Sequence, residues 1–162
     1  MKKIDLAEAF VAIGLSTAAL SCQATTKPLK DQMCAPLRAF VASVKADETR
    51  KLEFHTSWGQ NFKDSTDYAF LAKRCIHDSY APAKAVCDHL MEYGAIEFSG
   101  NNATRAIACL SPGTHFGWPF QLDRVEVSFP YGSEQRGSNV TIQFDKDSEL
   151  GGMVLKITAD GY

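Results

Sequence analysis

The residues with the most evident chemistry are two Cys-x-His units, Cys75-x-His77 and Cys87-x-His89, which lie 12 positions apart. Together they offer two sulfurs and two imidazoles, a ligand set that binds zinc in many proteins. Two observations count against zinc. Residues two positions apart on a helix point to different faces, and the spacing is not that of the usual zinc fingers. We therefore expect these cysteines to form disulfides, and we predict no metal site and no cofactor.

Nucleophilic or acid–base catalysis is not indicated either. The chain has no G-x-S-x-G motif of the serine-hydrolase type. Ser57 follows His55 in an alternating stretch, which predicts polar side chains on the surface of a strand. Acidic pairs are expected to be solvated surface charge, namely Glu92 with Glu97 and Asp123 with Glu126. No catalytic residue is predicted.

An aromatic loop is the best candidate for a binding site. Residues 113–120 combine two glycines, a proline and three aromatic residues. Exposed aromatic side chains in a loop often anchor a protein partner. We predict that His115, Phe116, Trp118 and Phe120 contact a partner. The alternative is that the three aromatic rings fill the gap between the helices and the sheet.

The N-terminal stretch is typical of an export signal. Two lysines, Lys2 and Lys3, precede an apolar run over residues 9–20, which ends just before Cys22. We expect residues 1–21 to be a signal peptide, 22–31 a polar tether and 32–162 a single folded domain. The alternatives are cleavage after a small residue such as Ala24, or an ordinary N-terminal helix.

Residues 19–22, Ala-Leu-Ser-Cys, resemble the lipobox of bacterial lipoproteins, with alanine where leucine is usual. The resemblance implies that Cys22 is acylated with more than one lipid chain, which would anchor the protein stably to a membrane. It also implies a periplasmic location. A soluble periplasmic or secreted protein is the alternative.

The number of cysteines agrees with a lipidated Cys22. The chain has five cysteines, and an odd number leaves one without a partner in an oxidising compartment. With Cys22 set aside, two disulfides can form among Cys34, Cys75, Cys87 and Cys109. One possibility joins Cys75 to Cys87 and Cys34 to Cys109. The other pairs Cys75 or Cys87 with Cys34, and the sequence does not choose between them.

Hydrophobic periodicity predicts an α+β fold. Apolar residues at three- and four-residue steps predict four helices. One starts near Ala35, two form an αα-hairpin over about 66–78 and 83–93, and one covers 102–110. Alternation predicts strands at 51–58, 122–131, 140–144 and 153–157. We expect the helices to pack on one face of a small antiparallel sheet that ends in a three-stranded meander. The early strand should join it as a fourth.

The charge balance limits the possible partners. The net charge is −2, from 17 basic and 19 acidic residues that are well mixed, so a nucleic-acid partner is not expected. In build, the chain is similar to the periplasmic immunity and inhibitor lipoproteins of Gram-negative bacteria. That resemblance implies a protein that is not an enzyme and that binds a cell-wall- or membrane-attacking toxin. The alternatives are a small periplasmic hydrolase with an unrecognised site, or a lipoprotein that binds lipid or glycan.

Overall fold

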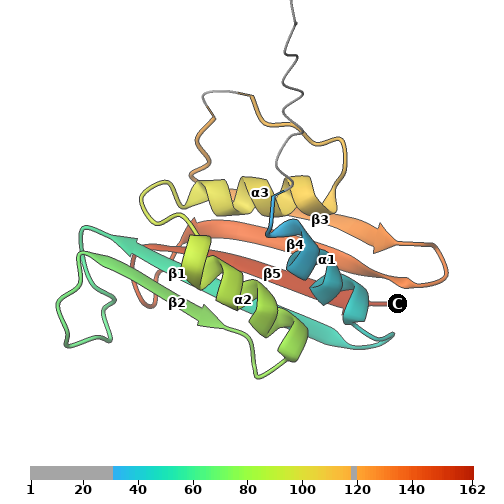
Figure 1. The fold of residues 1–162 in the computed structure, drawn as a ribbon, viewed down its shortest axis with the longest axis horizontal. Coiled ribbons are helices and arrows are strands. Elements are labelled where there is room, and N and C mark those ends of the chain that lie inside the picture. Colours follow the sequence, from blue (N-terminus) through green and yellow to red (C-terminus); the bar gives the residue numbers. More distant parts are fainter. Residues whose placement is uncertain (1–30, 118–119) are drawn as a thin grey trace, which may run out of the picture.

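Three helices lie on one face of a five-stranded sheet in the computed structural model, which describes residues 31–117 and 120–162 (Figure 1). The elements in chain order are α1 (Cys34–Ser43), β1 (Thr49–Trp58), β2 (Leu71–Ile76), α2 (Ala81–Tyr93), α3 (Gly100–Leu110), β3 (Val125–Gly132), β4 (Gly137–Lys146) and β5 (Met153–Gly161).

The strand order is β2-β1-β5-β4-β3, and all neighbouring strands are antiparallel. The last three strands form the predicted meander, and β1 pairs with β5, as expected for a fourth strand. The predicted α+β class, with helices against one face of an antiparallel sheet, is therefore confirmed.

Alternation along the strands sends one set of side chains into the core. Leu155 of β5 lies opposite Phe54 of β1, and Ile157 lies opposite both Leu52 and Ile142. All five are buried beneath the helices, whose own apolar stripes complete the core. The helices contribute chiefly Leu37, Phe40, Val41, Ala83, Val86, Leu90, Ala103, Ala106, Ile107 and Leu110.

The helix predicted over 66–78 is wrong, because this segment instead holds an irregular stretch followed by β2. Tyr68, at the start of the supposed helical stripe, is 87% exposed. Residues 71–76 pair with β1 along their whole length. A short apolar pattern of this kind fits helix and strand alike, and pairing with β1 decides between them.

The predicted αα-hairpin is wrong for the same reason, since α2 follows a strand. The disulfide between Cys75 and Cys87 therefore joins β2 to α2, with a Cα–Cα distance of 5.5 Å. Lys73, two residues before Cys75, donates a hydrogen bond of 3.1 Å to the carbonyl of Met91 near the end of α2. Basic groups stabilise the carbonyl end of a helix. β2 is therefore attached to α2 by the disulfide and by the hydrogen bond from the Lys73 ammonium.

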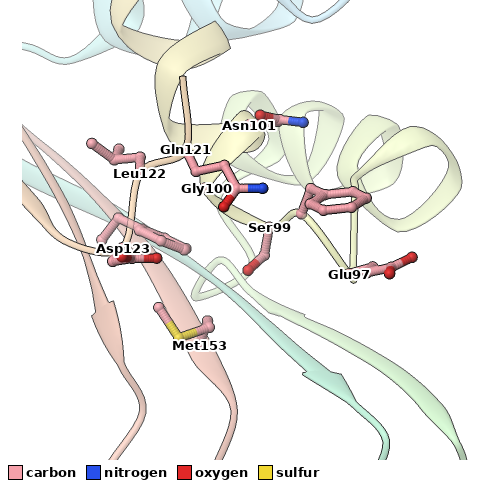
Figure 2. A pocket seen from close by; sticks show the side chains of 10 residues that line it. Glu97, Ser99, Gly100, Asn101, Gln121, Leu122, Asp123 and Met153 are labelled. Carbon is pink, nitrogen blue, oxygen red and sulfur yellow. The ribbon is translucent and has the colours of Figure 1, made fainter. Parts of the chain in front are cut away.

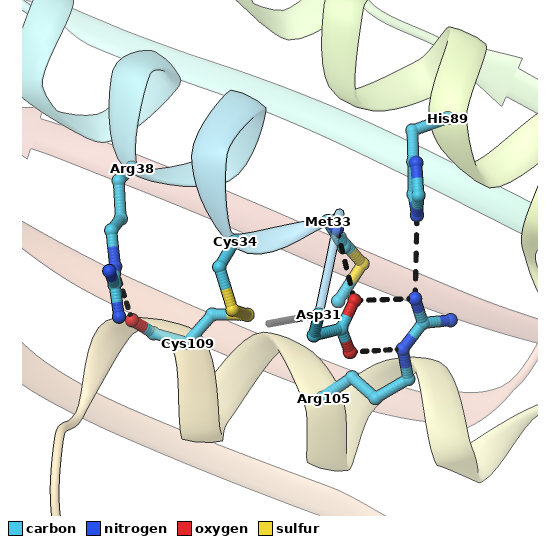
Figure 3. The surroundings of a disulfide bond; sticks show 7 residues. All are labelled: Asp31, Met33, Cys34, Arg38, His89, Arg105 and Cys109. Atoms are coloured by element: carbon cyan, nitrogen blue, oxygen red, sulfur yellow. Dashed lines mark hydrogen bonds and ion pairs between the residues drawn. A yellow bond between two sulfur atoms is a disulfide. The ribbon is translucent and has the colours of Figure 1, made fainter. Parts of the chain in front are cut away.

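The second disulfide joins Cys34, at the start of α1, to Cys109 of α3 (Figure 3). Arg38 donates a 2.8 Å hydrogen bond to the carbonyl of Cys109. Asp31 accepts two hydrogen bonds from Arg105 of α3, at 2.5 and 2.7 Å. The hydrogen bonds from Arg105 hold the pKa of the Asp31 carboxyl below its ordinary value of 3.8, although burial opposes them. The start of the domain is thus fastened to α3.

The two disulfides bear out the expectation that these four cysteines pair, and their sulfurs are not available to zinc. The predicted signal peptide, the predicted lipidation site Cys22 and nearly all of the predicted tether lie outside the described residues. No helix within 31–117 or 120–162 combines the length and the apolar character that a bilayer span requires.

Candidate functional site

The aromatic loop is divided between the core and the surface. Phe116 is half-buried and packs against the core, and its ring centroid lies 5.2 Å from that of Phe120. Phe120 is 42% exposed, and His115 is exposed as well. Trp118 lies outside the described residues. The structure thus brings Phe116 and Phe120 together and leaves His115 and Phe120 accessible to a partner.

A larger exposed apolar cluster lies at the end of the sheet where β1 and β2 meet. Trp58 and Phe70 make an edge-to-face contact with centroids 5.3 Å apart, and Leu71 lies opposite Trp58 in the strand register. Each of the three side chains is about half exposed. Trp58 lies on the same face of β1 as the buried Leu52 and Phe54, but it is 47% exposed.

Two adjoining cavities open beside Trp58 and form a groove. The first, of about 370 Å³, is lined by Trp58 and Ile96 and is called here the Trp58 cavity. The second, of about 190 Å³, is called the acidic pocket; it lies between the N-terminus of α3 and residues 121–123 (Figure 2). Their shared lining residues are Glu97, Ser99 and Met153. Phe98, 53% exposed, borders the acidic pocket.

Local interactions shape the walls of this groove. The side chain of Asn102, buried in α3, accepts a hydrogen bond from the amide of Ala95 at 2.9 Å and donates one to its carbonyl at 2.8 Å. The segment between α2 and α3 is therefore held in one place. Gly100 allows the chain near Leu122 to approach α3 closely, because a Cβ at residue 100 would lie 2.2 Å from the carbonyl oxygen of Leu122.

A buried His–Asp pair lies on the sheet face away from the helices. His55 was expected on the surface, but it is only 5% exposed. Its Nδ1 lies 2.7 Å from Oδ2 of Asp147. The segments that follow β1 and β4 are joined above this face, since Lys63 donates its amide to the carbonyl of Leu150 and its ammonium to that of Ser148. These loops cover His55, which explains why it is buried although the alternation of side chains along the strand predicted it at the surface.

The geometry of this pair suits the anchoring of a loop. Asp147 also accepts amide hydrogen bonds from Glu149 and Leu150, at 2.9 and 3.0 Å. Nε2 of His55 has no hydrogen-bond partner among the described residues, and the nearest carboxylate oxygen, from Glu53, is 3.5 Å away. Ser57 donates its hydroxyl to the carbonyl of Gln60. The neighbouring serine is thus engaged with the backbone, so it is not poised as a nucleophile beside His55.

The pKa of Asp147 predicts a specific acid sensitivity. Burial by itself would raise this pKa, but hydrogen bonds from the Leu150 amide, the His55 ring and the Glu149 amide outweigh burial and hold it below its ordinary value of 3.8. A lowered pKa in the folded state means that the ionised carboxylate adds stability above the unfolded pKa of about 3.9 and loses it as the pH falls further.

We therefore expect Asp147→Asn to be less stable than the unaltered protein at about pH 6, and the difference to shrink steadily below about pH 4. Urea unfolding midpoints of both proteins over this range measure it. Asp31, whose pKa is also lowered, does not interact with Asp147 and cancels in the difference. The pKa of Asp64 is also lowered, mainly by its hydrogen bond with Arg74, and an added Asp64→Asn change in both proteins removes its contribution, because the Asp147 charge acts on it. A difference that stays constant in acid would contradict the prediction.

No group of three or more His, Cys, Asp or Glu side chains within the described ranges is arranged to hold a metal ion. In comparisons with known proteins, no family model, no curated protein and no solved structure matches this chain.

Proposed function

We propose that this chain is a non-enzymatic protein of the bacterial envelope that binds another protein, as an immunity protein or inhibitor that neutralises a toxin. The observation that carries the proposal is the groove at the end of the sheet. It combines exposed aromatic side chains with cavities that are open to solvent. Tryptophan and other large aromatic residues dominate the binding energy of many protein interfaces.

The scaffold around the groove supports this proposal. The hydrogen bonds from Asn102 fix the segment between α2 and α3 that lines the groove, and the two disulfides attach α2 to β2 and α3 to α1. A surface that is already ordered loses little conformational entropy when a partner binds. Paired cysteines are also typical of proteins in oxidising compartments, which agrees with the proposed export and with lipid attachment at Cys22.

Capture from an envelope extract tests the proposal, with the full-length protein as bait. We expect a stoichiometric partner, and we expect Trp58→Ala to weaken its binding at least about tenfold, as truncation of an interface hot spot does. Trp118→Ala tests the aromatic loop in the same way. Ile76→Ala is a matched control, because Ile76 is an exposed apolar residue of β2 on the opposite face of the sheet. Equal capture by Trp58→Ala and the unaltered bait would exclude the groove, and recovery of no partner after mild cross-linking would count against the function.

A further inference from the structure

The acidic pocket has an unbalanced charge. Its lining includes two carboxylates, Glu97 and Asp123, and no lysine, arginine or histidine. Within the described parts of the chain, neither carboxylate forms an ion pair. Arg124, the nearest basic residue in sequence to Asp123, pairs instead with Asp145 at 2.9 Å.

The N-terminus of α3 does not neutralise these carboxylates. A helix N-terminus carries roughly half of an elementary positive charge, which is less than the charge of either carboxylate. Moreover, the amides of Asn101 and Asn102 already donate hydrogen bonds to the carbonyls of Phe98 and Ser99. The pocket therefore remains attractive to a cation.

The hydroxyl of a buried residue also faces this space. Ser99 is only 6% exposed, and it makes no capping hydrogen bond to α3. None of the side-chain hydrogen bonds among the described residues involves it. In Figure 2 the Ser99 side chain and the Asp123 carboxylate point toward the same space above Met153, while Glu97 lies at the outer rim. The Ser99 hydroxyl is not one of the fully buried unpaired atoms of the described residues, so it reaches the open space of the pocket and can hydrogen-bond a polar group that enters it.

The rest of the lining is mixed. Phe98, Leu122, Phe144 and Met153 are apolar, and Asn101 and Gln121 are polar without charge. A volume of about 190 Å³ is smaller than that of most small-molecule sites, which measure roughly 300–1,000 Å³. It suits a single side chain with an aliphatic stem and a cationic end, because such side chains bury their methylene groups and keep the charge near polar partners.

We propose that the acidic pocket receives a lysine or arginine side chain of the protein partner, with Asp123 pairing the cation, the Ser99 hydroxyl accepting a hydrogen bond from it, and Met153 and Leu122 packing against its stem. This inference rests on the proposed function and deepens it, since it states the chemistry by which the partner is recognised. Glu97 at the rim adds attraction at longer range.

Backbone NMR spectra of the full-length protein test the pocket without the partner. The probes are the N-acetyl, N-methylamide derivatives of lysine, arginine and norleucine, at millimolar concentrations. The norleucine probe has an aliphatic side chain without a charge. We expect both cationic probes to shift the amide signals of the pocket lining and the norleucine probe to leave them almost unchanged.

Two variants sharpen the test. Asp123→Asn should weaken binding of the lysine probe about two- to fivefold, since Asp123 is exposed and exposed ion pairs are weakened by solvent. Glu126→Gln removes an exposed acid on the opposite sheet face and should have no effect. Equal shifts with norleucine, an unchanged response in Asp123→Asn, or no pocket shifts with either cationic probe would each overturn the inference.

The capture assay separates this inference from the proposed function. If Asp123→Asn captures the partner as well as the unaltered bait while Trp58→Ala does not, the pocket does not hold a basic side chain but the binding function stands. If no bait captures a partner, the function fails, and the titrations still decide whether the pocket selects a cation.

Discussion

Replacing both Cys34 and Cys109 by alanine is expected to lower the free energy of unfolding by about 4–5 kcal/mol. The two cysteines are 75 positions apart, and the loss of a crosslink frees a long closed loop in the unfolded chain. A domain of ordinary stability has only about 5–15 kcal/mol in total. A domain at the lower end of that range would therefore lie close to its unfolding midpoint when both cysteines are replaced.

The disulfide between Cys75 and Cys87 provides the matched control. Cys75 and Cys87 are 12 positions apart, and the same relation between loop length and entropy gives about 3 kcal/mol. Urea unfolding of the two double-alanine variants measures both losses, and the Cys34/Cys109 variant should unfold at the lower urea concentration. The reverse order would mean that contacts around Cys75 and Cys87, rather than loop entropy, control the stability.

Gly152→Ala is expected to destabilise the protein by about 2–5 kcal/mol. Residue 152 has φ of +79°, which costs an L-residue about 1–2 kcal/mol. In addition, a Cβ there would lie 2.2 Å from the carbonyl oxygen of Thr56 in β1. Because a backbone oxygen cannot move without shifting the strand, relief of this overlap should cost about 1–3 kcal/mol more.

Gly151→Ala separates these two contributions. Gly151 also has a positive φ, +85°, but a Cβ there would meet nothing closer than 3.6 Å, at the flexible side chain of Lys63. It should therefore show the backbone cost alone. Thermal or urea unfolding of the two variants measures the difference. Equal losses of stability in the two variants would contradict the prediction and would show that the loop moves away from Thr56 without cost. Since Gly152 also lines the Trp58 cavity, the Gly152 variant should bind the partner less well.

Strands β1, β3, β4 and β5 were predicted because their signal is local. In β4 and β5, every second residue is apolar, and these residues are the ones that enter the core. The prediction for segment 66–78 failed because its apolar pattern was short and fitted helix and strand alike. Its state depends on pairing with β1, which its own local pattern does not show.

The groove was not predictable in the same way. Ser99 and Asp123 belong to different connections, and Met153 begins β5. Each has an unremarkable local pattern. Asp123 and Glu97 were expected at the solvated surface, and both are exposed. Only packing brings them to one pocket. The one signal available in the sequence was Gly100, which allows another segment to approach closely. A glycine alone does not show which segment lies against it.

The attachment of Asp31 and Cys34 to α3 would limit the distance of the acidic pocket from a membrane if the proposed lipid anchor is present. Cys109 lies near one end of α3 and Gly100, in the acidic pocket, at the other, so about 14 Å of helix separates them. If Cys22 carries lipid, the nine peptide units from Cys22 to Asp31 span at most about 30 Å. The pocket would then sample only a layer within about 50 Å of the bilayer. If the protein is the proposed inhibitor, a toxin that acts at the membrane surface would have to enter that layer, where tethering would raise the local concentration of the inhibitor.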